Sequence, residues 1–430
     1  MRVFGTASAL IAVIMSIWQL YTGYSTWPAI HQRSLHLTFA LALLFLMFPF
    51  RKRDDQKPGR LDTILRILFV IGSMAAGIYI FFNYTTIAYT RTGAPNTMDL
   101  VMGTIMIILV LEGTRRVIGL AMPLLTFLFL LYGLFGDMLP VLSHKGYDFK
   151  RIVSQMYLSQ EGIFGSVLGV SATFVFLFIL FGSILKYSKA GDIIINLAIA
   201  LFGRFRGGPA KVAIVGSGMF GSISGSAVAN VVGTGTFTIP MMKKIGYSPR
   251  FAAAVEATAS TGGQIMPPLM GAGAFLMVEF ARTPYWQIAI AAVIPAVLYY
   301  LTLFFAVDLR SAKQGLTGMK QEELPSIKQS LKDGWHVFIP LLALIIFLIG
   351  FQWSPTKAGF WTIILTIFIV SLRKSTRMDI RTFLKALENG AKDSVEVAVI
   401  CACAGILMGI IQLTGVGVVL SSALIQFAAG

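Results

Sequence analysis

GSGMFGSISGSAVANVVGTG, residues 216–235, lies at the centre of the segment that decides the fold of this chain. That segment, residues 212–242, has no charged residue in 31 positions, and basic residues flank it on both sides. As one straight helix it would extend about 46 Å, more than a hydrocarbon core of about 30 Å accommodates. Because basic flanks of the same sign are expected on one side of a membrane, the segment should enter and leave on that side. It therefore predicts a re-entrant hairpin of two half-helices.

The composition of this segment favours a hairpin over the alternative, a helix-packing face. Gly221-x-x-x-Gly225 by itself is the small-x-x-x-small pattern through which membrane helices pack. Such a face needs small residues on one stripe only, whereas six Gly, four Ser, three Thr and Asn230 occupy all faces between residues 216 and 238. Glycine permits a tight turn, and hydroxyl and amide groups can bond the backbone groups that the turn frees.

The remaining composition describes a chain that is solvated mostly by lipid. Of its 430 residues, 56% are hydrophobic and 13% are charged, and the mean hydropathy is +0.78. These values exclude a disordered chain, a collagen-like repeat, a coiled coil and an ordinary cytosolic enzyme. We therefore expect an all-α polytopic membrane protein, and hydropathy predicts about eleven transmembrane helices besides the hairpin. They lie near residues 4–27, 35–50, 62–83, 99–114, 117–139, 163–186, 250–278, 286–307, 335–352, 359–372 and 394–413.

The formal net charge of +16 follows the pattern of a membrane protein and not that of a nucleic-acid-binding protein. The basic residues cluster at the ends of apolar stretches, as the positive-inside rule expects. The basic loop 51–60 is thereby predicted in the cytoplasm, which also places the N-terminus there. Cys401 and Cys403 lie in an apolar run without His or carboxylate neighbours, so they are interpreted as packing residues and neither a metal site nor a disulfide is expected.

A second interrupted segment, residues 250–278, contains ASTGGQIMPP at positions 259–268. The adjacent Pro267 and Pro268 remove two helix donors and disfavour an α conformation before them, and Gly262 and Gly263 ease unwinding. A simple proline kink is the alternative, but the preceding Ser-Thr-Gly-Gly-Gln run is more polar than a kink requires. Unwound backbone at membrane depth is tolerated where it lines a cavity or the protein interior. We therefore expect a broken helix.

Two segments resemble each other weakly, residues 190–202 and 414–426, with Gly191 and Gly415 separated by 224 positions. The spans before them, 163–186 and 394–413, are predicted to cross in opposite directions, and stretches 147–161 and 378–390 before those are predicted to be amphipathic arms at the interface. Such opposed units are typical of transporters built from inverted repeats. At this offset, the partner of the hairpin would lie at about 436–466. We therefore expect the chain to be a fragment in which the second inverted repeat is incomplete.

Three motifs together carry a family resemblance: GRFRGGPAK (203–211), FGSISGSAVAN (220–230) and ASTGGQIMPP (259–268). They resemble the large membrane subunit of TRAP transporters, specifically the TAXI type, in which small and large membrane subunits are fused. The resemblance divides the chain into a small-subunit-like part (1–135), a first inverted repeat with hairpin and broken helix (136–307), a cytoplasmic loop (308–333), and scaffold helices with the start of the second repeat (334–430).

The resemblance implies a function and partners. It implies a multi-pass permease of the bacterial or archaeal cytoplasmic membrane that imports organic acids by secondary transport with an elevator motion. It further implies a separate periplasmic substrate-binding protein, and no cofactor apart from the coupling ion, Na⁺ or H⁺. A channel-like or purely scaffolding membrane subunit is the alternative function. An intramembrane enzyme is disfavoured, because no His or Asp accompanies the serine-rich turns within the apolar spans.

The candidate ion site consists of neutral oxygens. A monovalent cation needs about five or six oxygens, which hydroxyls and freed carbonyls at broken helices supply without a buried carboxylate. We expect the hairpin tip and the unwound run to face each other around one Na⁺. The expected ion-site residues are Ser222, Ser224, Gly225, Ser226, Asn230, Ser260, Thr261, Gly262 and Gly263. Unpaired N–H groups at the start of the second half-helix would bind a substrate carboxylate. The expected substrate residues are Asn230, Thr234, Gln264 and Pro267.

Two sets of intramembrane charges remain. Glu112, Arg115 and Arg116 cluster at a predicted helix end and are interpreted as an interfacial ion pair that fixes the small-subunit-like part to the scaffold. Glu256 lies one turn before the Ser260–Gly263 run. It either tunes that run or takes a proton, or else it lies at the cytoplasmic interface, and the sequence leaves these alternatives open.

Overall fold

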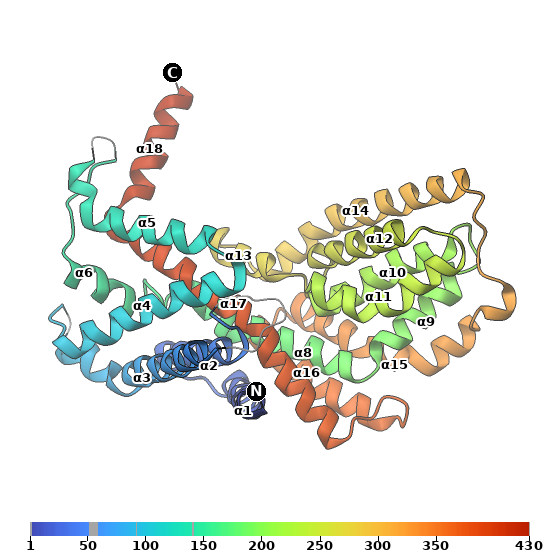
Figure 1. The fold of residues 1–430 in the computed structure, drawn as a ribbon, viewed down its shortest axis with the longest axis horizontal. Helices are drawn as coiled ribbons and strands as arrows, with labels where there is room; N and C mark the ends of the chain where they lie inside the picture. Colours follow the sequence, from blue (N-terminus) through green and yellow to red (C-terminus); the bar gives the residue numbers. More distant parts are fainter. Residues whose placement is uncertain (1, 51–58, 92, 140–141, 430) are drawn as a thin grey trace. The chain divides into compact units, whose positions relative to one another are not determined.

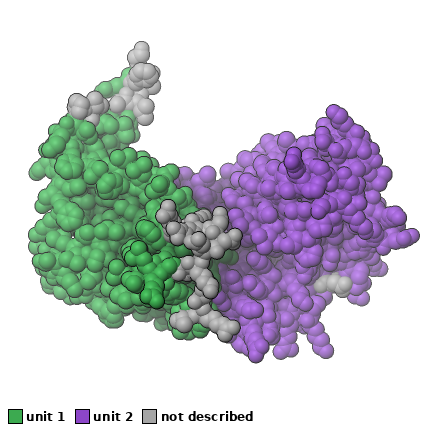
Figure 2. All heavy atoms as spheres, in the orientation of Figure 1, with its two compact units in different colours: residues 1–176, 391–430 green, residues 177–390 purple. Residues whose placement is uncertain are grey.

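The computed structural model describes all residues except 1, 51–58, 92, 140–141 and 430. Every regular element within the described residues is helical (Figure 1), which confirms the all-α prediction. The chain forms two units, one of residues 1–176 and 391–430 and the other of residues 177–390 (Figure 2). The basic loop from which the N-terminal orientation was predicted lies mostly outside the described residues.

The first unit is built around α2, the most deeply buried of its N-terminal helices, which packs against α1 and α3. A capping box starts α4, because Asn96 accepts from the Asp99 N–H at 2.7 Å while Asp99 accepts from the Asn96 N–H at 3.0 Å. The elements of this unit are α1 (Arg2–Tyr24), α2 (Ala29–Met47), α3 (Arg60–Thr90), α4 (Thr97–Ile118), α5 (Ala121–Phe135), η1 (Gly136–Met138), α6 (Phe149–Val153), η2 (Ser154–Leu158), α7 (Ser166–Val170), η3 (Ser171–Val175), the C-terminal part of α17 (Ile380–Thr414) and α18 (Val416–Ala429).

The charged cluster at the end of α4 forms the predicted ion pairs. Glu112 accepts from Arg115 Nε at 2.7 Å and from Arg116 Nε at 2.8 Å. Arg116 also donates to the carbonyl of Phe48 at 2.9 Å, and its guanidinium lies 4.9 Å from the Phe45 ring centroid. Since Phe48 is the residue that follows α2, this cluster fixes the end of α4 to the end of α2. These contacts lie within residues 1–135, whereas the cluster was predicted to fix that part of the chain to the scaffold.

The second unit contains three helices, α10, α11 and α12, that pack on one another, with α14 alongside α10 and α12 (Figure 1). Small residues allow this close packing, for example Ala210 and Ala213 of α10 against Ala252 and Ala259 of α12. The elements are α8 (Phe176–Tyr187), α9 (Ala190–Phe202), α10 (Gly208–Ser224), α11 (Ala227–Lys244), α12 (Pro249–Gly262), η4 (Gly263–Ile265), α13 (Ala272–Phe280), α14 (Tyr285–Lys313), η5 (Gln321–Glu323), α15 (Ile327–Ile345), η6 (Ile346–Gly350), α16 (Pro355–Leu372) and the start of α17.

Nine helices in the described part of the chain are long and apolar enough to cross a membrane, or ten if the bent pair 321–332 and 334–350 is one span. The predicted number was about eleven. One span is lost at residues 250–278, where the predicted interruption leaves α12 and α13 each too short to count. The predicted span at 335–352 counts only if the bent pair is taken as one span.

One predicted arm is wrong and the other is shorter than expected. Residues 378–390 were predicted to lie separately along the interface, but α17 runs without a break from Ile380 to Thr414. Gly390 is the residue that could have interrupted the helix between the predicted arm and the predicted span. It lies inside α17 and packs closely against α8, because a Cβ there would lie 3.2 Å from the Leu180 Cα. The arm predicted at 147–161 is helical over α6 and η2 only.

The two similar segments both form helices, α9 and α18, and each follows a left-handed residue. Lys189 has φ 64° directly before α9, and Gly415 has φ 70° directly before α18. In both similar segments, a residue in the left-handed conformation therefore separates the preceding long helix from the short helix that follows. The opposed membrane orientation of the two spans stays a prediction.

Candidate functional site

The predicted helical hairpin is confirmed, and its turn lies at Gly225 and Ser226. α10 ends at Ser224, Gly225 adopts the left-handed conformation with φ 61°, and the Ser226 hydroxyl caps α11 by accepting from the Ala229 N–H at 3.3 Å. A side chain at position 225 would collide with the carbonyl oxygen of Met270. The turn therefore requires glycine both for its dihedral angles and for the close approach of the broken helix.

The predicted broken helix is confirmed as well. After α12 and the single turn η4, residues 266–271 are not helical before α13 begins at Ala272. The peptide bond between Pro267 and Pro268 is cis. Two carbonyls that the break frees accept from one hydroxyl, since Tyr285 Oη lies 2.7 Å from the Pro268 oxygen and 2.6 Å from the Leu269 oxygen.

The hairpin and the broken helix meet through backbone atoms. A Cβ on Gly221 would lie 2.5 Å from the Cα of Gly263, so no side chain separates these two residues. The Leu269 N–H donates to the Ser222 carbonyl at 3.2 Å. Asn230 of α11 joins the two helices of the hairpin, because its amide donates to the Ser217 carbonyl of α10 at 2.8 Å. This contact between hairpin and broken helix is called the glycine seam below.

The structure brings most of the predicted ion-site residues to this seam. Ser222, Gly225, Asn230 and Gly263 all contribute to it, and Ser226 caps the adjoining helix. The hydroxyl oxygen of Ser224 at the tip is buried and has no hydrogen-bond partner among the described residues. A buried oxygen without a partner is an exception that requires an explanation, such as a water molecule or an ion.

Other predicted residues lie elsewhere. Thr261 is exposed and donates to the Ala257 carbonyl of its own helix at 2.8 Å, so it is not brought to the hairpin. Gly262 packs against α14, where a Cβ would meet the Tyr299 and Tyr300 rings. Of the predicted substrate residues, Gln264 is exposed next to the seam, with its carbonyl accepting from the Gly271 N–H at 2.7 Å.

The carboxylate of Glu256, whose position the sequence left open, lies buried between the three packed helices α10, α11 and α12. Glu256 is fully buried, so it does not lie at an exposed interface. Its Oε1 accepts from Ser217 at 2.9 Å, from Ser260 at 3.1 Å and from Thr234, and its Oε2 accepts from Thr238. The predicted substrate residue Thr234 and the predicted ion ligand Ser260 therefore point to this carboxylate.

The sequence analysis missed Ser217 and Thr238 as partners of Glu256. A signal was present, because Thr234 and Thr238 are four residues apart on one helix, as are Glu256 and Ser260 on another. That spacing places each pair on one helix face. The sequence could not indicate that these two faces meet.

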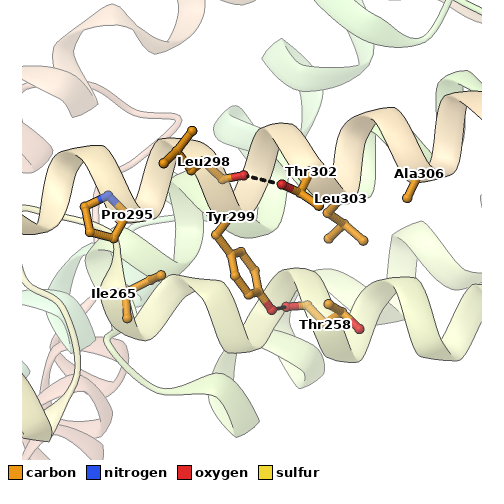
Figure 3. A pocket seen from close by; sticks show the side chains of 8 residues that line it. All are labelled: Thr258, Ile265, Pro295, Leu298, Tyr299, Thr302, Leu303 and Ala306. Carbon is orange, nitrogen blue, oxygen red and sulfur yellow. Dashed lines mark hydrogen bonds between the residues drawn. The ribbon is translucent and has the colours of Figure 1, made fainter.

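An apolar groove of about 570 Å³ is lined by residues of α12, η4 and α14 (Figure 3). Tyr299 reaches across it from α14 and donates to the Thr258 carbonyl of α12 at 2.7 Å. Its lining consists of Thr258, Ile265, Pro295, Leu298, Tyr299, Thr302, Leu303 and Ala306. Since it offers no cationic side chain, this groove does not suit an organic acid. Among the described residues there is also no group of three or more His, Cys, Asp or Glu for a transition metal.

Long apolar helices, a helical hairpin and a discontinuous helix with neutral oxygens at the break define a polytopic membrane protein of the transporter class. A family model described as "Tripartite ATP-independent periplasmic transporter, DctM component" matches residues 105–430, which is three quarters of the sequence. The chain belongs to this family of transport proteins, which is not a family of enzymes.

Curated relatives agree with this family. The "C4-dicarboxylate TRAP transporter large permease protein DctM" of Vibrio cholerae is 30% identical over 200 residues, or 45% of this chain and 42% of that protein. A "Putative TRAP transporter large permease protein" of Haemophilus influenzae is 27% identical over 235 residues, or 53% of each. The "2,3-diketo-L-gulonate TRAP transporter large permease protein YiaN" of Escherichia coli is 24% identical over 201 residues, or 45% of each. The chain spans about half the length of the curated relatives it matches.

Proposed function

We propose that the chain is the permease component of a cation-coupled secondary transporter that imports organic acids delivered by a periplasmic binding protein. Na⁺ is the proposed coupling ion at the hairpin tip. The observation that carries the proposal is the glycine seam, where the tip residue Ser224 presents a buried hydroxyl oxygen that has no partner in the described part of the chain. Hydroxyl and carbonyl oxygens at broken helices are the usual ligands for such an ion in transporters.

The substrate is proposed to be a carboxylate. Relatives with printed substrates are named for a C4-dicarboxylate and for 2,3-diketo-L-gulonate, two different organic acids. The start of α11 supports a carboxylate site, because the first turn of a helix presents unpaired N–H groups and a positive dipole end. Ser226 caps this end next to the seam, and the exposed side chain of Gln264 lies nearby on η4.

We further propose that residues 1–135 are a fused small subunit of the TAXI type and that the N-terminus is cytoplasmic. The family match starts at residue 105, after three long apolar helices that it does not cover. Such helices could widen a scaffold against which the hairpin-bearing unit moves. The opposed orientation of the two similar segments would supply the elevator geometry.

Uptake in liposomes that contain the protein and its binding protein tests the ion site. Ser224→Ala should reduce Na⁺-stimulated uptake of the organic acid about tenfold, since one oxygen ligand is lost. Ser371→Ala is the matched control, because Ser371 is exposed and already donates to the Ile367 carbonyl at 2.7 Å. Equal uptake by both variants at every Na⁺ concentration would remove the proposed ion site.

The same liposomes distinguish a carrier from the alternative of a channel-like or scaffolding subunit. Unlabelled substrate on the opposite side should accelerate the uptake of labelled substrate, because a carrier returns faster when it is loaded. A channel shows no such acceleration, and a scaffold shows no uptake of its own. Either result would contradict the carrier function.

A further inference from the structure

The apolar groove lined by α12, η4 and α14 has no role in the proposed transport function (Figure 3). One of its walls, α14, is long and apolar enough to cross a membrane, and only 6% of its apolar window is buried. Large apolar side chains such as Ile294, Leu298 and Phe305 are exposed along it. The groove therefore lies on a face that the hydrocarbon of a membrane can reach.

The lining of the groove has no hydrogen-bond donor to spare. Its hydroxyls all donate to backbone carbonyls, from Tyr299 to Thr258 at 2.7 Å, from Thr302 to Leu298 at 2.8 Å and from Thr258 to Ala254 at 2.8 Å. A polar ligand would lose its hydrogen bonds to water there without gaining new ones. The groove therefore suits a hydrocarbon chain.

The length of the groove matches one leaflet of a bilayer. From Pro295 to Ala306 its wall on α14 extends about 17 Å. Half of a hydrocarbon core of about 30 Å is about 15 Å. A transmembrane helix of a partner protein would need a groove along the whole core. The acyl chain of a single lipid fits the observed length better.

Basic side chains lie just beyond one end of the groove. Arg310 and Lys313 follow Ala306 by four and seven residues, so they lie about 6 and 11 Å further along the same side of α14. The guanidinium of Arg310 lies 5.7 Å from the Phe251 ring centroid, which brings the start of α12 to this end as well. Arg250 directly precedes Phe251, and all three basic side chains are exposed.

The charge at this end is not matched by carboxylates. The nearest acid on α14, Asp308, is already bound by two other cations, one of them Lys211 at 2.6 Å. No salt bridge joins the three basic residues to an acid in the described part of the chain. At the opposite end, α14 carries no charge from Tyr285 to Pro295. The groove thus complements a molecule that has a hydrocarbon chain and an anionic group at one end.

We propose that the groove binds a phospholipid with an anionic headgroup. One acyl chain lies along α14 from Ala306 toward Pro295, and the phosphate lies near Arg310 and Lys313, whose long side chains extend toward the headgroup region. The far end of the chain reaches Ile265, the last residue of η4, so the lipid contacts the broken helix directly before its interruption. This site requires that the chain lies in a membrane, but it does not depend on the proposed transport function.

Photo-crosslinking in vesicles tests the proposal. The purified full chain is reconstituted in phosphatidylcholine that contains a small fraction of a probe lipid with a diazirine near the end of one acyl chain. The probe is either phosphatidylglycerol, which is anionic, or phosphatidylcholine, and labelled residues are mapped by mass spectrometry of peptides. Relative to labelling of α16, which reports general contact with lipid, the anionic probe should label residues 258–265 and 295–306 about fivefold more than the neutral probe.

Two variants separate the headgroup contact from the acyl-chain contact. Arg310→Gln combined with Lys313→Gln should reduce labelling by the anionic probe to the level of the neutral one. Thr302→Trp should reduce labelling of the lining by the anionic probe about fivefold without a change of charge, because the indole fills the groove and the lost hydroxyl bonded only its own helix.

A matched control removes two charges elsewhere. Lys328 and Lys332 are exposed on α15, which does not line the groove, so Lys328→Gln combined with Lys332→Gln should leave the labelling unchanged. Circular dichroism and the elution volume in size-exclusion chromatography check that every variant is folded.

Three results would overturn the proposal. Equal labelling of the lining by the two probes would mean that the groove meets only bulk lipid. Labelling that persists in the double variant and in Thr302→Trp would place the lipid elsewhere. A lining that neither probe labels, while α16 is labelled, would mean that protein covers the groove, for example a second copy of the chain.

Discussion

The glycine seam makes a sharp prediction about Gly221. Replacing it by alanine would place a Cβ 2.5 Å from the Gly263 Cα and 2.8 Å from the Asn230 Nδ2. The first of these neighbours is backbone and cannot rotate away. α10 must therefore move away from η4, or the amide of Asn230 must leave the Ser217 carbonyl to which it donates.

Gly216, five residues earlier on the same helix, offers a matched control. A Cβ there would lie 3.9 Å from the Ala198 Cβ and 3.9 Å from the Ile195 Cγ1, which is ordinary contact. Both substitutions replace a glycine inside a helix by alanine, which has the higher helix propensity. This stabilises each variant by up to about 1 kcal/mol, so the effect is common to the two. Their difference therefore isolates the close approach at the seam.

The magnitude follows from overpacking. Forcing a methyl group into closely packed atoms costs about 1–3 kcal/mol, so Gly221→Ala should be less stable than Gly216→Ala by that amount. A difference of 1–2 kcal/mol changes the equilibrium between folded and unfolded protein by about 5- to 30-fold. Unfolding of the purified protein by titration with sodium dodecyl sulfate in mixed micelles, followed by circular dichroism, measures this difference.

Equal stability of the two variants, within about 0.5 kcal/mol, would refute the reasoning. It would mean that the hairpin and the broken helix do not meet through backbone atoms. Gly263→Ala approaches the same contact from the other side, where a Cβ would lie 2.6 Å from the Gly221 Cα. It should show the same loss, so agreement between these two variants adds a further check.

Two other predictions concern charged groups. Arg116→Met should lower the free energy of unfolding by about 2–3 kcal/mol in the same titration, because it removes a buried partner of Glu112. Arg115→Met should lower it by at most about 1 kcal/mol, because the Arg115 side chain is one-third exposed. Hydrogen bonds from Thr382 lower the pKa of Asp379 at the start of α17, so its carboxylate should stabilise the first turn at neutral pH and lose that effect as the pH falls through its folded pKa. Amide hydrogen exchange in that turn should accelerate in acid, and Asp379→Asn should abolish the dependence on pH.

Much of the fold could be predicted because its signals are local. The charge-free length of residues 212–242 and its glycine content predicted the hairpin, and the turn at Gly225 lies within the quoted stretch. The prolines at 267 and 268 predicted the break after α12. The wrong arm at 378–390 has a tertiary cause, since the packing of Gly390 against Leu180 is not visible in the sequence.

The candidate site could be predicted only in part for a similar reason. Composition located the hydroxyl-rich tip, but whether a hydroxyl points to a cation, to a backbone carbonyl or to a carboxylate depends on helix rotation. Thr261 and Ser260 are neighbours in sequence, yet one is exposed and the other donates to Glu256. The environment of Glu256 depends on two other helices, so periodicity in α12 alone left its position open.

The glycine seam also determines what strengthens or loosens the contact between hairpin and broken helix. Two glycines that face each other bury little apolar surface, so the hydrophobic effect contributes little to this contact. The contact is held instead by hydrogen bonds to carbonyl oxygens, from the Leu269 N–H to Ser222 and, at 3.5 Å, from the Asn230 amide to Ser260. Such bonds are strong where water is excluded. Water that enters can replace these bonds at small cost. We therefore expect water that reaches the seam to weaken the contact between the hairpin and the broken helix.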